Sequence, residues 1–208
     1  MSIIEELEKY AKENKIPIMQ KDGILYLCNY IKNNNIKSVL EIGSAIGYSA
    51  IMMASSQNEI HITTIEKDTD RYNLAVQNIK KANLEKKITI KNMDANEYST
   101  NNKYDLIFID ASKGNNQKFF QKFKDNLENC GVIITDNLSF HGLVENPELI
   151  KTKRTQKLVE KIKNYITFLD TNKEFKTTYI PVGDKISISR RIIDEQNNSN
   201  PKKWETPK

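Results

Sequence analysis

The sequence is poor in cysteine and has no long hydrophobic run. Its two cysteines, Cys28 and Cys130, are spaced like neither a zinc site nor a redox motif, so we expect two reduced thiols and a cytoplasmic protein. No apolar run approaches the roughly 20 residues that a membrane span needs. The acidic start of the chain also lacks the basic and apolar regions of a signal peptide. These absences argue against a secreted, disulfide-stabilised or membrane-bound protein.

The composition is that of an ordinary globular protein, 38% hydrophobic and 28% charged. A length of 208 residues suits one domain with a sizeable core and is short for two. We expect a single domain over residues 1–193, followed by a flexible tail over residues 194–208, which are polar and interrupted by proline. The formal net charge of +5 suits an anionic partner, although a lysine-rich surface also produces it.

Hydrophobic periodicity divides the chain at Ser38. Residues 1–36 carry two amphipathic helical patterns and predict a helical cap. Short apolar runs then alternate with helical stretches, which predicts a parallel sheet covered by helices on both faces. The expected strands are 38–42, 60–65, 88–91, 104–109 and 132–135, and the expected helices are 48–55, 69–82, 117–127 and 155–169.

Two further strand-like runs, 177–180 and 186–192, close the pattern. The connection between them is too short for the crossover that parallel strands require, so it predicts an antiparallel hairpin. The expected fold is therefore α/β, with a doubly wound, mostly parallel seven-stranded sheet and an antiparallel C-terminal hairpin.

A glycine-containing loop follows the first expected strand at Gly43, where ligands bind in doubly wound sheets. A dinucleotide fingerprint would place glycine two residues later, but that position is Ala45, which weakens a pyrophosphate reading. Glu66 ends the next strand at the spacing of a ribose-binding acid, and Asp94 ends the third. A tight turn with a solvated Glu66 is the alternative. An acid without a phosphate cradle favours a nucleoside bearing no phosphate, such as S-adenosylmethionine, with Glu41 serving its amino-acid moiety.

Oxygen-bearing side chains end two more strands of the expected sheet. Asp110 follows the run 104–109, and Asp136 and Asn137 follow the run 132–135. Either carboxylate alone would suit a loop acid or a helix cap. Together they form a hard-oxygen set, which suits Mg²⁺ and leaves coordination positions for substrate and water. The sequence therefore predicts a magnesium site beside the nucleoside pocket.

Several motifs in order carry a family resemblance: EIGSAIGYSA, IEKD, YDLIFIDASKG and GVIITDN. The sequence resembles the metal-dependent O-methyltransferases of the catechol and caffeoyl-CoA type, with a Rossmann-like methyltransferase fold. The resemblance implies a homodimer, Mg²⁺ at Asp110, Asp136 and Asn137, and catalytic roles for Asp110 and for Lys113, where catechol enzymes keep a catalytic lysine. It implies a cofactor site for S-adenosylmethionine formed by Met19, Glu41, Gly43, Ser49, Glu66, Asp94 and Ala95, bordered by Asp110.

A narrower likeness concerns the substrate. The segments KIPIMQKDG, AIGYSAIMMA, GVIITDNLSFHGLV and IPVGDKISIS are similar to bacterial tRNA 5-hydroxyuridine methyltransferases. These make 5-methoxyuridine at the wobble position, so the likeness implies the tRNA anticodon loop as partner, with no DNA and no membrane. The 5-hydroxyl and 4-carbonyl of 5-hydroxyuracil can chelate Mg²⁺ as a catechol does. Lys113 is then expected to take the hydroxyl proton or to stabilise the anion.

A basic segment follows the expected metal site and favours an RNA substrate. Lys153, Arg154 and Lys157 are its tentative phosphate contacts, and a solvated helix face is the alternative. Phe140 and His141 are candidates to stack on an extruded base. Three other functions stay open: O-methylation of a small catechol-like metabolite, NAD-dependent oxidoreduction, and non-catalytic RNA binding.

Overall fold

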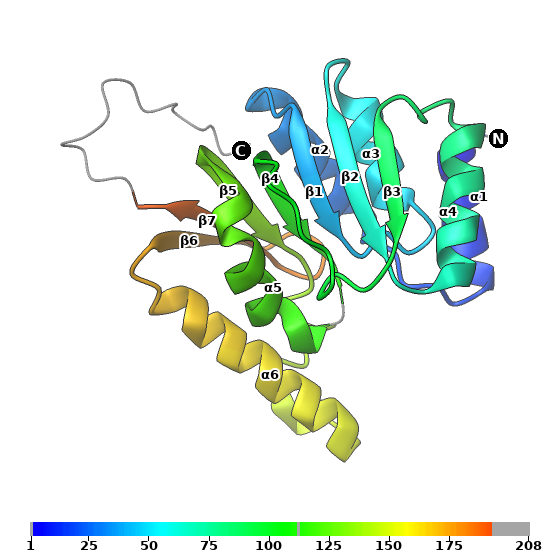
Figure 1. Cartoon of the computed structure of the whole chain (residues 1–208). Helices are drawn as coiled ribbons and strands as arrows, with labels where there is room; N and C mark the ends of the chain where they lie inside the picture. The colour runs from blue at the N-terminus through cyan, green and yellow to red at the C-terminus, as the bar shows by residue number, and fades with distance from the viewer. Residues whose placement is uncertain (1, 112, 193–208) are drawn as a thin grey trace.

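The computed structural model describes residues 2–111 and 113–192, without the side chain of Lys113. Its centre is a seven-stranded sheet in the order β3-β2-β1-β4-β5-β7-β6 (Figure 1). The strands are β1 (Ser38–Ile42), β2 (His61–Glu66), β3 (Ile88–Asn92), β4 (Tyr104–Ile109), β5 (Leu127–Thr135), β6 (Phe175–Ile180) and β7 (Ile186–Arg191). The first five are parallel, whereas β7 is antiparallel to both β5 and β6. The predicted α/β fold, including its C-terminal hairpin, is confirmed.

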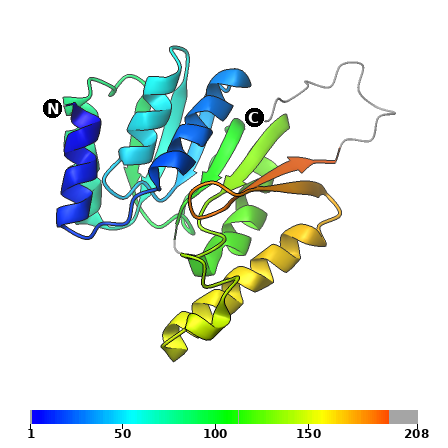
Figure 2. The same cartoon turned by 180° about the vertical axis from the view of Figure 1, so that it is seen from behind.

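Helices cover both faces of the sheet, as Figures 1 and 2 show from opposite sides. They are α1 (Ile3–Glu13), α2 (Lys21–Asn33), α3 (Tyr48–Ser56), α4 (Thr69–Lys81), α5 (Asn116–Phe123) and α6 (Lys153–Asp170), with short 3-10 turns η1 (Lys113–Asn115), η2 (Lys124–Asn126) and η3 (Pro147–Leu149). Among the described residues, no helix is long and apolar enough to cross a membrane.

Two hydrophobic clusters form because successive strand side chains point to opposite faces. In β4, Leu106 and Phe108 join the cluster under α1 to α4, whereas Ile107 and Ile109 join the cluster under α5 and α6. All four side chains are fully buried. This double burial explains why the second half of the strand reads as a continuous apolar run, which ends at the half-buried Asp110.

One predicted helix is shorter than expected. The pattern over 117–127 predicted helix to its end, but α5 ends at Phe123 and β5 already begins at Leu127, before the expected start of that strand. Leu127 is buried in the cluster under α5 and α6. Its side chain lies over Gly131, where an added Cβ would come within 2.7 Å of Leu127 Cγ. Tertiary packing of Leu127 therefore overrides the helical period. The predicted tail, 194–208, lies outside the described residues.

Candidate active site

A cavity of about 1060 Å³ lies at the carboxyl ends of the parallel strands. Typical small-molecule pockets measure roughly 300–1,000 Å³, so there is room for a nucleoside-sized ligand and part of a second molecule. Its walls come from the loops after β1 to β5, the extended segment 17–19 and the first turns of α6. Of the predicted site residues, those that line it are Met19, Gly43, Ser49, Glu66, Asp94, Ala95, Asp110, Asn137, Lys153, Arg154 and Lys157.

The loop after β1 is shaped by close backbone contacts. Gly43 has φ +95°, and an added Cβ would lie 2.6 Å from the carbonyl oxygen of Asp110. Glycine is therefore required where the ends of β1 and β4 meet. Ala45 also has a left-handed backbone, with φ 44°. Its N–H donates to Oε2 of Glu66 at 2.9 Å, and this bond offsets part of the strain.

Glu66 faces the cavity and is also part of the loop's support. Its Oε2 accepts from Ala45 N and its Oε1 from Asp68 N, both at 2.9 Å. A carboxylate has about four acceptor sites, so each oxygen can still accept a bond from a ligand hydroxyl. Asp94 lies nearby and accepts from the backbone and side-chain nitrogens of Asn96 at 2.8 Å, which holds the pKa of its carboxyl below the usual value.

Glu41 does not line the cavity. It is fully buried beneath the loop, where Ser49 Oγ and Thr64 Oγ1 each donate to its carboxylate at 2.5 Å. Burial raises the pKa of Glu41 to about 7, although the two hydroxyls lower it. The structure places Glu41 beneath the cavity rather than in its wall: Glu41 supports Ser49, and Ser49 borders the cavity.

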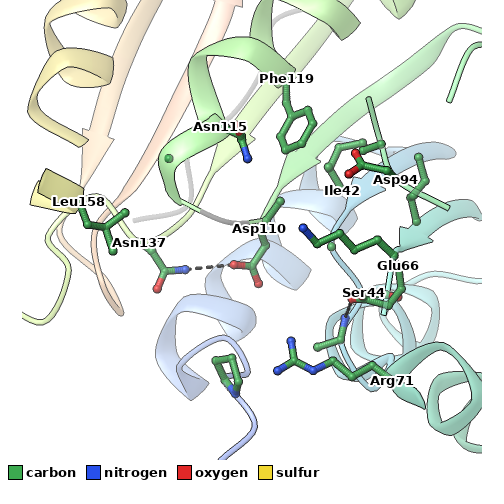
Figure 3. A pocket seen from close by; sticks show the side chains of 18 of the residues that line it. Ile42, Ser44, Glu66, Arg71, Asp94, Asp110, Asn115, Phe119, Asn137 and Leu158 are labelled. Atoms are coloured by element: carbon green, nitrogen blue, oxygen red, sulfur yellow. Dashed lines mark hydrogen bonds between the residues drawn. The ribbon is translucent and has the colours of Figure 1, made fainter. Parts of the chain in front are cut away.

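The three expected metal ligands converge. Nδ2 of Asn137 donates to Oδ1 of Asp110 at 3.1 Å, the bond drawn in Figure 3. The same Nδ2 donates to Oδ2 of Asp136 at 2.9 Å, so one amide lies between two carboxylates. Asn137 has a left-handed backbone, with φ 67°. Asp110 and Asn137 line the cavity, whereas Asp136 is 3% exposed and lies behind them.

The chemistry of this donor set fits Mg²⁺. A half-turn of the Asn137 amide presents its oxygen in place of Nδ2 and gives three hard oxygens around one point. Among the described residues, no group of three or more His, Cys, Asp or Glu side chains could hold a metal ion. Carboxylate and amide oxygens are typical ligands of Mg²⁺, whereas structural zinc takes Cys and His.

The first turns of α6 form a cationic wall, which we define as Lys153, Arg154, Lys157 and Lys161, all exposed and all lining the cavity. Within the described part of the chain, none of the four forms an ion pair. Lys153 and Arg154, in the first turn, oppose the helix dipole at a cost of about 0.3–1 kcal/mol each. These two side chains therefore do not stabilise α6 through its dipole, and the four cations together suit an anionic ligand.

The remaining candidates are the catalytic residue Lys113 and the stacking residues Phe140 and His141. Lys113 begins η1, three residues after Asp110, and its side chain lies outside the described structure. Next to it, Gly114 lies against Lys161: an added Cβ would be 3.2 Å from Nζ. Phe140 lines the cavity, but His141 is exposed and does not, although the two rings are 5.5 Å apart.

Several lining residues escaped prediction from the sequence. They include Ser44, Arg71, Met93, Asn115 and Phe119. Ser44 directly follows Gly43, and its buried hydroxyl has no hydrogen-bond partner among the described residues. This position in the glycine-containing loop could have identified Ser44 as a cavity residue from the sequence. Arg71 and Phe119 lie on helices at positions that the periodicity assigns to surface and core, so only the tertiary fold brings them to the cavity.

Comparison with known proteins gives one consistent result. A family model described as O-methyltransferase matches residues 1–192. A caffeoyl-CoA O-methyltransferase of Populus kitakamiensis is 28% identical over 199 residues, which cover 89% of this chain and 82% of the relative. The structure of a Staphylococcus aureus protein provisionally assigned as a caffeoyl-CoA O-methyltransferase is 33% identical, with a TM-score of 0.87 over 92% of this chain and 93% of its own. The SAH-bound Podospora anserina methyltransferase PaMTH1 shares the fold at 18% identity, with a TM-score of 0.82 over 93% of this chain and 89% of its own.

Proposed function

Because the chain belongs to the O-methyltransferase family, we propose that it transfers the methyl group of S-adenosylmethionine to a hydroxyl oxygen with the help of Mg²⁺. The observation that carries this proposal is the meeting, in one cavity, of the ribose-type acid Glu66 with the oxygen cluster of Asp110 and Asn137. A nucleoside cofactor and a chelating acceptor can therefore lie side by side.

The cofactor lies along the loops after β1, β2 and β3. Glu66 accepts the ribose hydroxyls, while Met93 and Phe119 offer apolar surface to the adenine. Ser44 and Ser49 offer hydroxyls to the amino-acid moiety, and Glu41 holds Ser49 from below. A structure of PaMTH1 with SAH bound, on the same fold, supports a cofactor of this class.

The acceptor lies on the other side of the cavity, near Asp110, Asn137 and Phe140. Mg²⁺ held by Asp110, Asp136 and Asn137 would lower the pKa of an acceptor hydroxyl and stabilise the oxyanion. The hydroxyl proton goes to Lys113, or Lys113 serves as a fixed cation beside the oxygen. The oxygen then takes the methyl group as the carbon–sulfur bond breaks, which leaves a neutral thioether.

For the acceptor, we propose 5-hydroxyuridine at the wobble position of tRNA. The cationic wall borders the same cavity as the oxygen cluster, and a polynucleotide places phosphates on both sides of its reacting base. The second candidate is a small catechol-like metabolite. The caffeoyl-CoA O-methyltransferases among the relatives favour it, because the caffeoyl group in their names is a catechol.

The test offers tRNA lacking the methoxy group, and a catechol, together with labelled S-adenosylmethionine. Label in the tRNA supports the first acceptor, whereas label in the catechol alone supports the second. Neutralising Lys153, Arg154 and Lys157 together should raise the KM for tRNA and reduce the salt slope of affinity by about 0.7 per lost single-strand contact.

A matched triple variant at Lys80, Lys81 and Lys86 controls for net charge. These lysines are exposed and lie outside the cavity. The control should keep the wild-type slope. Equal salt slopes for the wild type and both variants would show that the cationic wall takes no part in RNA binding.

A further inference from the structure

The loop that follows β5 has an unusual backbone. Asn137, Phe140 and His141 have φ values of 67°, 50° and 57°, and Gly142 has 80°. Asn and His enter this left-handed region more readily than other residues, but a bulky residue such as Phe140 persists there only where its surroundings hold it. Two of these residues, Asn137 and Phe140, line the cavity. Whatever holds the loop therefore also sets the position of the proposed metal-binding amide.

The turn between β6 and β7 holds this loop. The carbonyl oxygens of Asp184 and Lys185 accept from Ser139 N at 2.9 Å and Leu138 N at 3.0 Å. The side chain of Asp184 adds a third bond, because its Oδ1 accepts from His141 N at 2.6 Å. That bond reaches the left-handed part of the loop directly.

Burial of the Asp184 side chain at this point lowers the stability of the fold. It is 4% exposed, and its Oδ2 has no hydrogen-bond partner in the part of the chain that the structure describes. A buried carboxylate costs stability when only one of its two oxygens accepts a hydrogen bond. Asp184 does not line the cavity, so it does not touch a ligand. A role in positioning the loop explains why a carboxylate lies at this point.

The same turn also touches the opposite side of the cavity. Gly183 N donates to Oδ2 of Asp22 at 3.1 Å, at the start of α2. Gly183 lies against Gly23, which in turn contacts Met19, where an added Cβ on Gly23 would be 3.2 Å from Met19 Cε. Met19 lines the cavity on the proposed cofactor side. The turn is therefore bonded on two sides. Asp184 joins it to the loop after β5 on the metal side of the cavity, and Asp22 joins it to the start of α2 on the cofactor side.

We propose that Asp184 is a positioning residue for the metal centre: its bond to His141 N fixes the loop and so keeps the side chain of Asn137 beside Asp110 and Asp136. The inference rests on the proposed magnesium site. The turn at residues 181–185 then supports the metal side through Asp184 and the cofactor side through Asp22.

The test measures Mn²⁺ binding by electron paramagnetic resonance and S-adenosylmethionine binding by calorimetry, on the full chain. Asp184→Ala should weaken Mn²⁺ binding about 10- to 100-fold, the usual effect of losing a partner behind the metal ligands, with cofactor affinity unchanged. Asp184→Asn keeps an oxygen that can accept from His141 N and should retain nearly all of the Mn²⁺ affinity. Asp22→Ala, the matched control, should weaken the binding of S-adenosylmethionine and leave Mn²⁺ binding unchanged.

Each other outcome contradicts the inference in a distinct way. Wild-type Mn²⁺ affinity in Asp184→Ala would overturn it while leaving the metal site intact. Equal losses in Asp184→Ala and Asp184→Asn would show that the buried charge matters rather than the hydrogen bond. Failure of the wild-type protein to bind Mn²⁺ would remove the proposed metal site itself, and the inference with it. Circular dichroism distinguishes each result from unfolding.

Discussion

Replacement of Glu66 by alanine tests the cofactor side of the cavity. Glu66 is 7% exposed, and each of its carboxylate oxygens already accepts one backbone N–H at 2.9 Å. If the remaining acceptor sites bind the two ribose hydroxyls, the variant loses two charge-assisted bonds, each worth about 1.5–3 kcal/mol. The sum, about 3–6 kcal/mol, corresponds to a rise of roughly 150- to 20,000-fold in the Kd for S-adenosylmethionine.

The variant should also lose stability, because the amides of Ala45 and Asp68 lose their acceptor, at roughly 1–3 kcal/mol for each that stays out of water. Asp68→Ala is the control for this effect. It removes only the N-cap bond in which Asp68 Oδ1 accepts from Arg71 N, worth about 0.5–2 kcal/mol, and the Asp68 side chain does not line the cavity.

Calorimetry on the two variants, with urea unfolding alongside, separates binding from stability. We expect both to be destabilised and only Glu66→Ala to lose cofactor affinity. Glu66→Gln, which keeps one carbonyl acceptor, should fall between wild type and alanine. A wild-type Kd in Glu66→Ala would refute the ribose contact.

Three further substitutions address the parts around this cavity. The pKa of Glu41 is raised from 4.5 to about 7, so the folded chain holds the proton more tightly than the unfolded chain, and stability should fall as pH rises across that interval. Glu41→Gln should remove this fall and gain about 3 kcal/mol at pH 8, as measured by urea unfolding at pH 5 and pH 8; an unchanged pH slope would contradict it. Gly43→Ala should cost more stability than Gly142→Ala, because both glycines have positive φ but only the Gly43 Cβ meets a backbone oxygen, at 2.6 Å; equal losses in unfolding would exclude the clash. Asp136→Ala should abolish methyl transfer and keep cofactor binding, and parallel loss of both in calorimetry and activity assays would place Asp136 on the wrong side of the cavity.

The sequence predicted best what depends on strand ends. Asp110 and Asn137 lie just beyond the largely apolar ends of β4 and β5, and parallel strands bring their carboxyl ends to one edge, so their meeting could be foreseen. The wall formed by Lys153, Arg154 and Lys157 was foreseen as a basic segment, and the structure adds that it borders the same cavity.

Features that depend on contacts between distant elements could not be predicted in the same way. Glu41 lies one residue before the end of β1, close to the strand edge where Asp110 lies, yet Ser49 and Thr64 enclose it from α3 and β2. The role inferred for Asp184 depends on His141, 43 residues away in the chain. No periodicity in the sequence indicates either arrangement.

The most direct test of the account measures the initial rate of methyl transfer from labelled S-adenosylmethionine to a catechol and to 5-hydroxyuridine-containing tRNA, after treatment with a chelator and after restoring Mg²⁺. The account predicts no transfer to either acceptor in chelator and recovery with Mg²⁺ in the wild-type protein. It predicts no recovery in a double variant that carries alanine at Asp110 and Asn137. Transfer that continues at the full rate in chelator, or in that double variant, would contradict a cation-assisted O-methyltransferase at this site.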